Sequence, residues 1–309
     1  MNVVSTSPSG TEILCALGVD PVAVSHSCDY PARVRELPVI DRSRVEGGSS
    51  GERHRRTVQV SADGHVYEID VETLEAVEPD LIVSQEVCGV CAVDTTLIDE
   101  VLSETEVDPA VVGMHADRFE DLFSCVRSVG AAVGRAERAE ELIAELRDRV
   151  DRIERETSDL DRRPRVAVVE WMDPVVVAGR WVPDLVQIAG GEYGLAAAGE
   201  RAAKPSWEAF REYDPEVIVV TPCGYSVRET VEKRGELFAR EGWDEVSAVR
   251  SGEVYAMDGA SYLTRWTPRL VDALDRLACL LHPDRFGEPP GDVVALRDTL
   301  ATASPIGDR

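Results

Sequence analysis

Short apolar runs alternate with helix-forming stretches along most of the chain, and one long helical stretch divides this alternation into two halves. Runs such as VVS, VAV, LIVS and PAVV come before residue 117, and runs such as VAVV, EVIVV and EVYA come after residue 160. Strands that alternate with helices pair as parallel sheets covered by helices on both faces. We therefore predict an α/β protein with two doubly wound parallel-sheet lobes.

The dividing stretch, roughly residues 117–159, has the pattern of a long amphipathic helix. Leu142, Leu146, Val150 and Ile153 are spaced by three or four residues, and charged residues fill most positions between them. This spacing places the apolar side chains in one stripe along the helix. The pattern is too short for a coiled coil, so we predict a single long helix that bridges the lobes.

These boundaries give an N-terminal α/β lobe at 1–116, a connecting helical segment at 117–160, a C-terminal α/β lobe at 161–284 and a polar tail at 285–309. Residues 41–66 interrupt the first lobe and are rich in Gly, Ser and Arg. Such composition predicts an exposed insertion or hairpin, with a functional flap as the alternative. Near the start of the chain, Ser9 and Glu12 have the spacing of a capping box.

The charge balance excludes one large class of partner. Aspartate and glutamate total 58 residues against 33 lysines and arginines, which gives a formal net charge of −25. Such a surface repels phosphate backbones, so we expect no binding to nucleic acid. Lysine occurs only at positions 204 and 233. Many carboxylates with almost no lysine also suit a cytosol of high salt, and we therefore expect a halophilic source.

The N-terminal sequence and the cysteines bear on location. MNVVSTSPSG has no basic region followed by a long apolar run, and no run of about 20 apolar residues occurs in the chain. Seven scattered cysteines suit a reducing compartment better than a disulfide framework. We therefore expect a cytoplasmic protein that does not insert into membranes. A start codon assigned too far downstream would instead allow an extracytoplasmic location.

Aromatic residues concentrate in the segments that follow the predicted strands. In open α/β sheets, ligands bind beyond the carboxyl ends of the strands. Although aromatics make up only 6% of the chain, these segments hold six of them, namely Tyr30, Trp171, Trp207, Tyr225, Tyr262 and Trp266. Flat side chains with a few polar groups suit a large, planar, partly apolar ligand. We predict that these six residues border a ligand cleft between the lobes, and that Arg265 pairs with a polar group of the ligand.

The stretch SQEVCGVCAV carries Cys88 and Cys91 in a C-x-x-C spacing, directly after a predicted strand. Three interpretations stay open. The thiols are simply part of a loop, or they contact a metal or ligand together with Cys28, His26 or His115, or they form a redox pair. The sequence has no nucleophile elbow, Walker A loop, zinc-protease helix or dinucleotide-binding loop. We therefore expect a non-enzymatic protein that requires no cofactor.

Five segments resemble, in order, blocks of the cobalamin-binding proteins of ABC importers. They are VVSTSPSGTEILCALG, VSHSCDYP, VEPDLIVSQ, YDPEVIVV and TPRLVDALDRLACLL. That family is part of a wider group that also binds iron–siderophores and haem. The resemblance covers about residues 1–282, apart from 41–66. It implies two α/β lobes bridged by one rigid helix, with the ligand between the lobes.

The resemblance also implies roles for individual residues. Glu72 and Glu208 match the acidic residues that dock family members onto basic pockets of an ABC permease. SYLTR at 261–265 matches a corrinoid-contact segment, retaining Tyr262 and Arg265. Ser261 and Ser27 depart from that pattern, since the family has an acidic and an aromatic residue there.

The function predicted from this resemblance is binding of cobalamin or a related corrinoid by a monomer that serves, or is related to, an ABC importer. The first alternative is a binder of iron–siderophores or haem. The second is a cytoplasmic accessory protein with a metal- or redox-linked role that uses Cys88 and Cys91.

Overall fold

The first apolar runs form the parallel sheet of the N-terminal lobe in the computed structural model, which describes residues 1–45, 47–86 and 92–296. Four strands lie in the order β2 (Ala23–Val24), β1 (Val3–Ser5), β5 (Leu81–Gln85) and β6 (Ala110–Met114), and all neighbours are parallel. The helices of this lobe are α1 (Pro8–Ala16), the short 3-10 helix η1 (Ala32–Glu36), α3 (Val71–Ala76), α4 (Thr95–Leu102) and α5 (Asp121–Ala132). Strand residues alternate between the two helical layers, because successive side chains of a strand point to opposite faces. Val3 and Val83 pack with α1 and α5, whereas Val4 and Ile82 pack with α3 and α4.

Helix α1 begins two residues earlier than the capping-box spacing predicts. Ser7 is the N-cap, and its side chain accepts a hydrogen bond from the backbone N–H of Gly10. The prediction that Ser9 and Glu12 form a capping box is therefore wrong. Glu12 lies inside the helix instead, which frees its carboxylate for a contact outside the N-terminal lobe.

The C-terminal lobe has a five-stranded sheet in the order β11 (Val294–Ala295), β10 (Val254–Ala256), β9 (Val217–Val220), β7 (Val166–Trp171) and β8 (Val176–Val177). The three central strands are parallel, and both edge strands are antiparallel to their neighbours. Its helices are α7 (Val182–Ile188), α8 (Trp207–Tyr213), α9 (Val227–Lys233), α10 (Gly235–Phe238), η2 (Trp243–Glu245), α11 (Ser247–Ser251), α12 (Leu270–Leu281) and α13 (Pro283–Phe286).

The prediction of a polar tail from residue 285 is wrong as far as residue 296. Strand β11 pairs with β10, and the flanking side chains of Val293 and Leu296 are buried. The average composition of the segment did not reveal strand β11, because polar residues surround this short apolar stretch.

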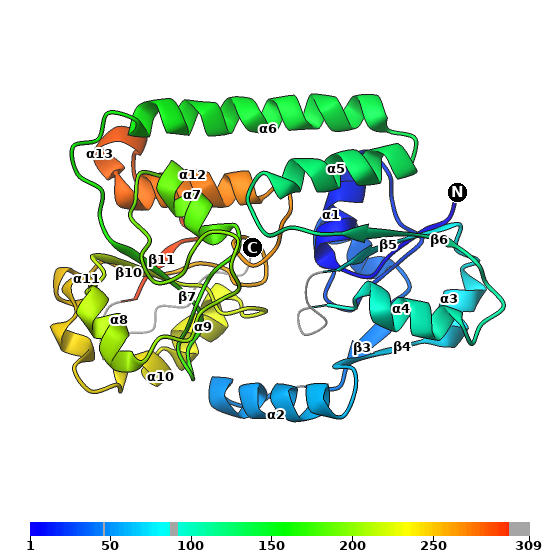
Figure 1. The fold of residues 1–309 in the computed structure, drawn as a ribbon, viewed down its shortest axis with the longest axis horizontal. Helices are drawn as coiled ribbons and strands as arrows, with labels where there is room; N and C mark the ends of the chain where they lie inside the picture. The colour runs from blue at the N-terminus through cyan, green and yellow to red at the C-terminus, as the bar shows by residue number, and fades with distance from the viewer. Residues whose placement is uncertain (46, 87–91, 297–309) are drawn as a thin grey trace.

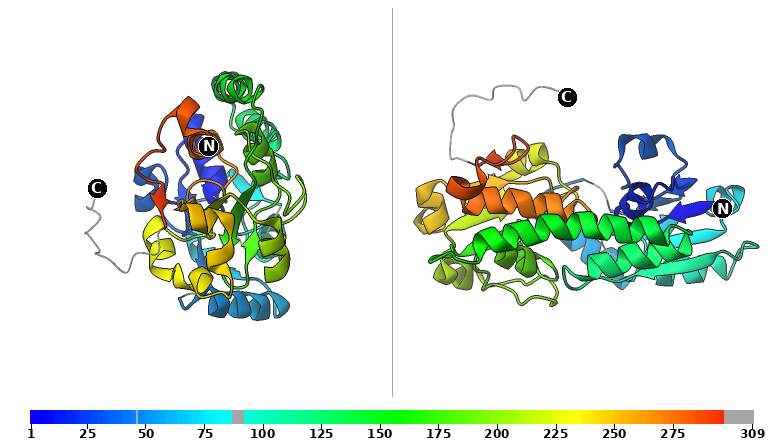
Figure 2. Two further views of the ribbon diagram at one scale, coloured as in Figure 1. Left: turned by 90° about the vertical axis from the view of Figure 1, so that its left-hand side faces the viewer. Right: turned by 90° about the horizontal axis from the view of Figure 1, so that it is seen from above.

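The connecting segment consists of two helices rather than one. Helix α5 ends near Gly134, whose φ of 67° lies in the left-handed region that favours glycine, and α6 (Ala136–Thr157) follows. Helix α6 runs along both lobes at one end of the molecule (Figures 1 and 2). Its buried stripe, which includes Leu142, Leu146 and Ile153, joins the packed faces of both sheets in one continuous hydrophobic cluster. Neither α6 nor any other helix of the described ranges combines the length and hydropathy needed to cross a membrane.

Residues 41–66 contain a helix that the sequence pattern does not reveal. Strands β3 (Asp41–Ser43) and β4 (Tyr67–Ile69) pair as an antiparallel hairpin, and α2 (Ser50–Ala62) lies in the connection between them. Helix α2 extends from the N-terminal lobe toward the C-terminal lobe, on the side of the molecule opposite α6 (Figure 1). It has a complete capping box, formed by Ser49 and Glu52.

The role of α6 predicts a large stability difference between two adjacent substitutions. Ile153 is fully buried in the shared cluster, so Ile153→Ala should lower the free energy of unfolding by about 2–5 kcal/mol. Glu154→Ala, at the neighbouring exposed position, should leave it nearly unchanged. Urea denaturation of both variants measures the difference. Equal midpoints would show that α6 does not contribute to a core shared by the lobes.

Candidate functional site at the interlobe seam

The carboxyl ends of the strands of both lobes meet each other. Ser27 and Asp29 follow β2 and Asp117 follows β6, whereas Trp171 ends β7, Tyr225 follows β9 and Arg265 follows β10. Each of these residues contacts the other lobe or the helix α2 that lies between the lobes. We call this meeting surface the interlobe seam. It brings together the loops in which a sheet of this type holds its ligand.

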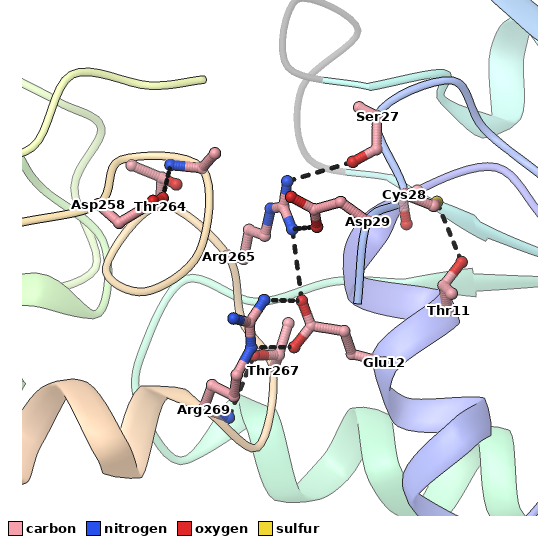
Figure 3. A network of polar contacts seen from close by, with 12 residues as sticks. Thr11, Glu12, Ser27, Cys28, Asp29, Asp258, Thr264, Arg265, Thr267 and Arg269 are labelled. Atoms are coloured by element: carbon pink, nitrogen blue, oxygen red, sulfur yellow. Dashed lines mark hydrogen bonds and ion pairs between the residues drawn. The ribbon is translucent and has the colours of Figure 1, made fainter. Parts of the chain in front are cut away.

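A buried carboxylate and two arginines form the centre of the seam (Figure 3). Glu12, with a side chain only 2% exposed, accepts hydrogen bonds from Arg269 at 2.5 and 2.8 Å. Arg265 donates to Asp29 at 2.7 Å and to the backbone carbonyl of Ser27 at 3.2 Å. Burial opposes the charge of Arg269, but its hydrogen bonds to Glu12 raise its pKa above the ordinary value. The cluster therefore links the lobes through fixed opposite charges.

Two further ion pairs cross between the lobes beside helix α7. Arg118 donates to both oxygens of Asp184 at 2.8 and 2.6 Å. Arg180 pairs with Asp117, whose other oxygen lies 2.8 Å from Nε2 of His115. Paired arginines and carboxylates of this kind set the register of the two lobes more than they add stability.

The start of α2 docks directly onto the C-terminal lobe. The indole Nε1 of Trp171 donates to the carbonyl of Ser50 at 3.1 Å, and the Ser50 hydroxyl lies 3.4 Å from the hydroxyl of Tyr225. Lys233 donates to the carbonyl of Gly48 at 2.7 Å. A Cβ atom at Gly51 would lie 2.5 Å from a carboxylate oxygen of Asp173, so a larger residue there would displace that side chain. Helix α2 therefore bridges the lobes through polar contacts.

Positive charges gather where α2 meets the C-terminal lobe. The guanidinium of Arg53 lies 5.1 Å from the ring centroid of Tyr225 and 5.7 Å from that of Trp171. Lys233 lies 4.5 Å from the Tyr225 centroid, and Lys204 lies 3.4 Å from His54. Burial, together with the charge of Lys204, lowers the pKa of His54.

Among the described residues, Arg53, Lys204 and Lys233 form no ion pair with a carboxylate. Two acidic groups on the docking face have other contacts, since Asp173 pairs with Arg240 and one carboxylate oxygen of Glu236 accepts from the backbone N–H of Ser50. The three cations therefore remain available to an anion that enters beside α2.

Four of the six predicted aromatic residues lie at or next to the seam. Trp171 and Tyr225 contact each other, with ring centroids 5.5 Å apart, and α2 covers them. Tyr30 is half-exposed and lines a cavity of about 420 Å³ next to α6, where its ring faces Arg269 at 4.2 Å. Tyr262 donates a hydrogen bond to Asp292. The pKa of Tyr262 is raised to about 12, mainly by burial and then by this hydrogen bond.

Two predicted ligand contacts lie inside the C-terminal lobe instead. Trp266 is buried and packs edge-on against Trp181, with ring centroids 5.3 Å apart. Trp207 is partly buried, stacks on Phe210 and Trp243, and donates to the carbonyl of Glu241 at 2.7 Å. Both rings thus pack against other aromatic side chains of the C-terminal lobe.

Cys28 is not part of a metal-binding cluster among the described residues. It is buried, its sulfur lies 3.1 Å from the hydroxyl of Thr11, and burial raises its pKa to about 12. Within the described ranges, no cluster of three or more histidine, cysteine or acidic residues could hold a metal ion. Cys88 and Cys91 lie outside the described residues, so their interpretation stays open.

The two residues expected to dock a permease are exposed and lie on different lobes. Glu72 lies in the first turn of α3, and Glu208 lies in the first turn of α8. Both carboxylates are thus accessible at helix N-termini, where a negative charge is favourable.

Sequence reasoning missed the residues that make most of the contacts across the seam. Glu12, Asp29 and Arg269 were not predicted to contribute, nor were Ser50 and Arg53 of α2. A single glutamate among the apolar residues of α1 is a signal for a buried ion pair, because a carboxylate in such a position needs a partner. The sequence offers no comparable signal that would place α2 against Trp171 and Tyr225.

Comparisons with known proteins agree with this architecture. The family pattern described as "Periplasmic binding protein" matches residues 3–260. A curated relative, the uncharacterized ABC transporter substrate-binding lipoprotein YvrC of Bacillus subtilis, is 23% identical over 93% of this chain and 81% of its own length.

Two solved structures show the same fold over nearly their full length. A periplasmic heme binding protein from Pseudomonas aeruginosa is 20% identical, with a TM-score of 0.72 over 96% of this chain and 99% of its own. The periplasmic vitamin B12 binding protein BtuF of Vibrio cholerae is 19% identical, with a TM-score of 0.65 over 91% and 96% of the two chains.

The buried cluster at the seam predicts a large effect of removing one charge. Glu12→Gln leaves Arg265 and Arg269 without their shared carboxylate, and should lower the free energy of unfolding by about 3 kcal/mol. Asp20 also accepts two hydrogen bonds from one arginine, Arg33, but this pair lies on the exposed surface. Asp20→Asn should therefore change the free energy of unfolding little. Urea denaturation compares the two, and equal losses would contradict a special role for the buried cluster.

Proposed function

Because this chain belongs to the periplasmic binding protein family, we propose that it is the substrate-binding component of an ABC importer, with an anionic metal chelate such as haem as its ligand. The ligand binds between the lobes, at the interlobe seam, and is released without chemical change. The apolar core along α6 holds the lobes together, while the contacts at the seam are polar and can be replaced by contacts to a ligand. The expected movement is a small hinge opening at the seam.

One observation favours haem or another anionic iron chelate over a corrinoid. Arg53 and Lys233 lie near the ring of Tyr225, and Lys204 lies beside His54 of α2. None of the three cations has an ion pair with a carboxylate among the described residues, in a chain with a net charge of −25. Haem carries propionate carboxylates and a planar ring, which suit cations placed over aromatic side chains. The side chains of cobalamin end mostly in neutral amides, which gain less from such cations.

Cobalamin remains the second candidate. A vitamin B12 binder shares the fold, as does a haem binder. Against it, Ser261 replaces the acidic residue and Ser27 the aromatic residue expected of corrinoid contacts. In addition, Trp207 and Trp266 pack against other aromatic side chains of the C-terminal lobe.

We also propose an extracytoplasmic location in place of the cytoplasmic one expected from the N-terminal sequence. The curated relative is a substrate-binding lipoprotein of an ABC transporter, and such a protein meets its permease outside the cytoplasm. The halophilic source predicted from the charge balance stays a prediction.

The proposed ligand class can be tested by direct titration. Ferric haem should bind at least about tenfold more tightly than cyanocobalamin, because only haem offers carboxylates to the cations beside α2. Calorimetry and visible absorbance measure both affinities, with a ferric hydroxamate siderophore as a third ligand. Molar KCl should weaken the binding of haem by screening.

A matched pair of variants on α9 provides the control. Lys233→Ala should weaken haem binding about tenfold, whereas Arg228→Ala, which removes an exposed cation paired with Glu232, should not change it. Tighter binding of cyanocobalamin would replace haem by a corrinoid as the ligand. No binding of any of the three ligands would reject the proposed function.

The proposed docking residues make a separate prediction. The double variant Glu72→Ala/Glu208→Ala should bind ligand as the unmodified protein does, but support uptake into membrane vesicles of the source organism at least about tenfold less well. Glu75→Ala/Glu212→Ala removes exposed carboxylates from the same two helices and should leave uptake unchanged. Equal uptake with both double variants would refute docking through Glu72 and Glu208.

A further inference from the structure

His26 is held by a buried carboxylate at the carboxyl end of β2. Asp41, whose side chain is fully buried, accepts a hydrogen bond from the backbone N–H of His26 at 2.7 Å and lies 2.8 Å from its ring Nδ1. The other oxygen of Asp41 accepts from the Ser25 hydroxyl at 2.7 Å. Asp41 is thus anchored from both sides, and it fixes both the backbone and the ring of His26.

This arrangement determines which ring nitrogen of His26 is free. Because a carboxylate can only accept, the neutral imidazole carries its proton on Nδ1 and its lone pair on Nε2. Among the described residues, Nε2 has no hydrogen-bond partner, and a third of the side chain is exposed. The ring of Tyr67, with its centroid 5.6 Å away, limits rotation of the imidazole.

The three side chains do not have the geometry of a hydrolytic triad. The Ser25 hydroxyl donates to Asp41, and its distance to the histidine is 3.5 Å, measured to the same Nδ1 that faces the carboxylate. A triad serine would instead meet Nε2. A histidine with one nitrogen on a carboxylate and the other exposed is the arrangement that proteins use for metal ligands.

The position of His26 fits a ligand held at the interlobe seam. The carbonyl of Ser27, the next residue, accepts from Arg265 of the C-terminal lobe at 3.2 Å. Asp41 opens the hairpin whose connection carries α2 to Trp171. The loop that carries His26 therefore reaches the seam through its neighbour Ser27.

His115 is the other histidine at a strand end of this lobe, and it is arranged differently. Its Nε2 lies 2.8 Å from Asp117, an exposed carboxylate that also pairs with Arg180 of the C-terminal lobe. In His115, Nε2 is therefore occupied by an ion-paired carboxylate of the seam, whereas Nε2 of His26 has no such partner among the described residues.

We infer that Nε2 of His26 is an axial ligand to the metal of a macrocyclic chelate bound at the seam. This inference rests on the proposed function and narrows its ligand class. A single imidazole cannot hold a free metal ion, but it is sufficient for a metal whose equatorial positions are filled by a macrocycle, as in haem. A hexadentate siderophore leaves its iron no open position, so the inference selects a macrocycle over a siderophore. Asp41 acts as a positioning residue, since it orients the imidazole.

Titration of the whole protein with ferric haem tests this assignment. The complex should show the absorbance and electron paramagnetic resonance spectra of imidazole-ligated iron. His26→Ala should lose these spectra and bind haem at least about tenfold more weakly, and added imidazole should restore the spectra. Asp41→Asn should retain the ligation but weaken binding, with a shifted reduction potential. His65→Ala is the matched control, because His65 pairs with an exposed Glu100, and it should behave as the unmodified protein.

A second variant guards against a failure to fold. His26→Gln retains a side-chain amide that can donate to Asp41 but supplies no imidazole, and it should also lose the spectra. A parallel titration with aquocobalamin, whose axial water an imidazole can replace, separates the two macrocycles. An imidazole-type spectral change with aquocobalamin, absent in His26→Ala and His26→Gln, would support the inference with a corrinoid as the ligand.

The remaining outcomes separate this inference from the proposed function. Identical haem spectra for the unmodified protein, His26→Ala and His26→Gln would overturn the role of His26 while the proposed function stands. Binding of a ferric siderophore but of neither macrocycle would overturn the inference and leave the protein an importer component. No binding of any of these ligands would overturn both.

Discussion

The packing of α6 is the interaction on which the rest of the structure depends. Its apolar stripe contributes to one hydrophobic cluster that continues from the sheet of the N-terminal lobe to α7 and α12 of the C-terminal lobe. Arg149 reinforces this attachment through Asp272 and Asp275 at 2.6 and 2.5 Å. Because burial of apolar surface stabilises in proportion to area, at roughly 25 cal/mol per Å², this end of the molecule does not open without a large loss of stability. The lobes are therefore fixed at α6 and can separate only at the opposite end.

The seam is held by a different kind of interaction. The hydrogen bonds of α2 to Trp171 and Tyr225 are polar, and water or a ligand can replace them at modest net cost. The buried ion pairs around Glu12 are costlier to break. An apolar hinge with polar contacts at the mouth allows a ligand to enter without disturbing the core. Helix α2 adds a second bridge between the lobes, so access to the seam depends on both the lobes and this inserted helix.

The distribution of charge complements this mechanical division. Most arginines are paired with carboxylates along the surface and between the lobes, while the only two lysines of the chain lie against the α2 segment. A small cationic group in an otherwise acidic protein favours one class of ligand strongly, because the surrounding field repels anions everywhere else. His26 and Asp41 then provide a directional contact where the cations provide only attraction.

The amino-acid sequence determined most of the elements and their order, since strands and helices follow from local apolar periodicity. The break at Gly134, which separates α5 from α6, was not predicted. The sequence also indicated which loops hold a ligand, because open parallel sheets bind ligands beyond the carboxyl ends of their strands.

Only the tertiary structure decided which side chains meet in these loops. Glu12 and Arg269 lie 257 residues apart in the chain. Trp207 and Trp266 carry the same local signal as Trp171 but pack against aromatic side chains of the C-terminal lobe. Helix α2 has no apolar face that would reveal its partner. Contacts of this kind depend on how two separately folded sheets are held against each other by α6, and no local pattern records that distance or orientation.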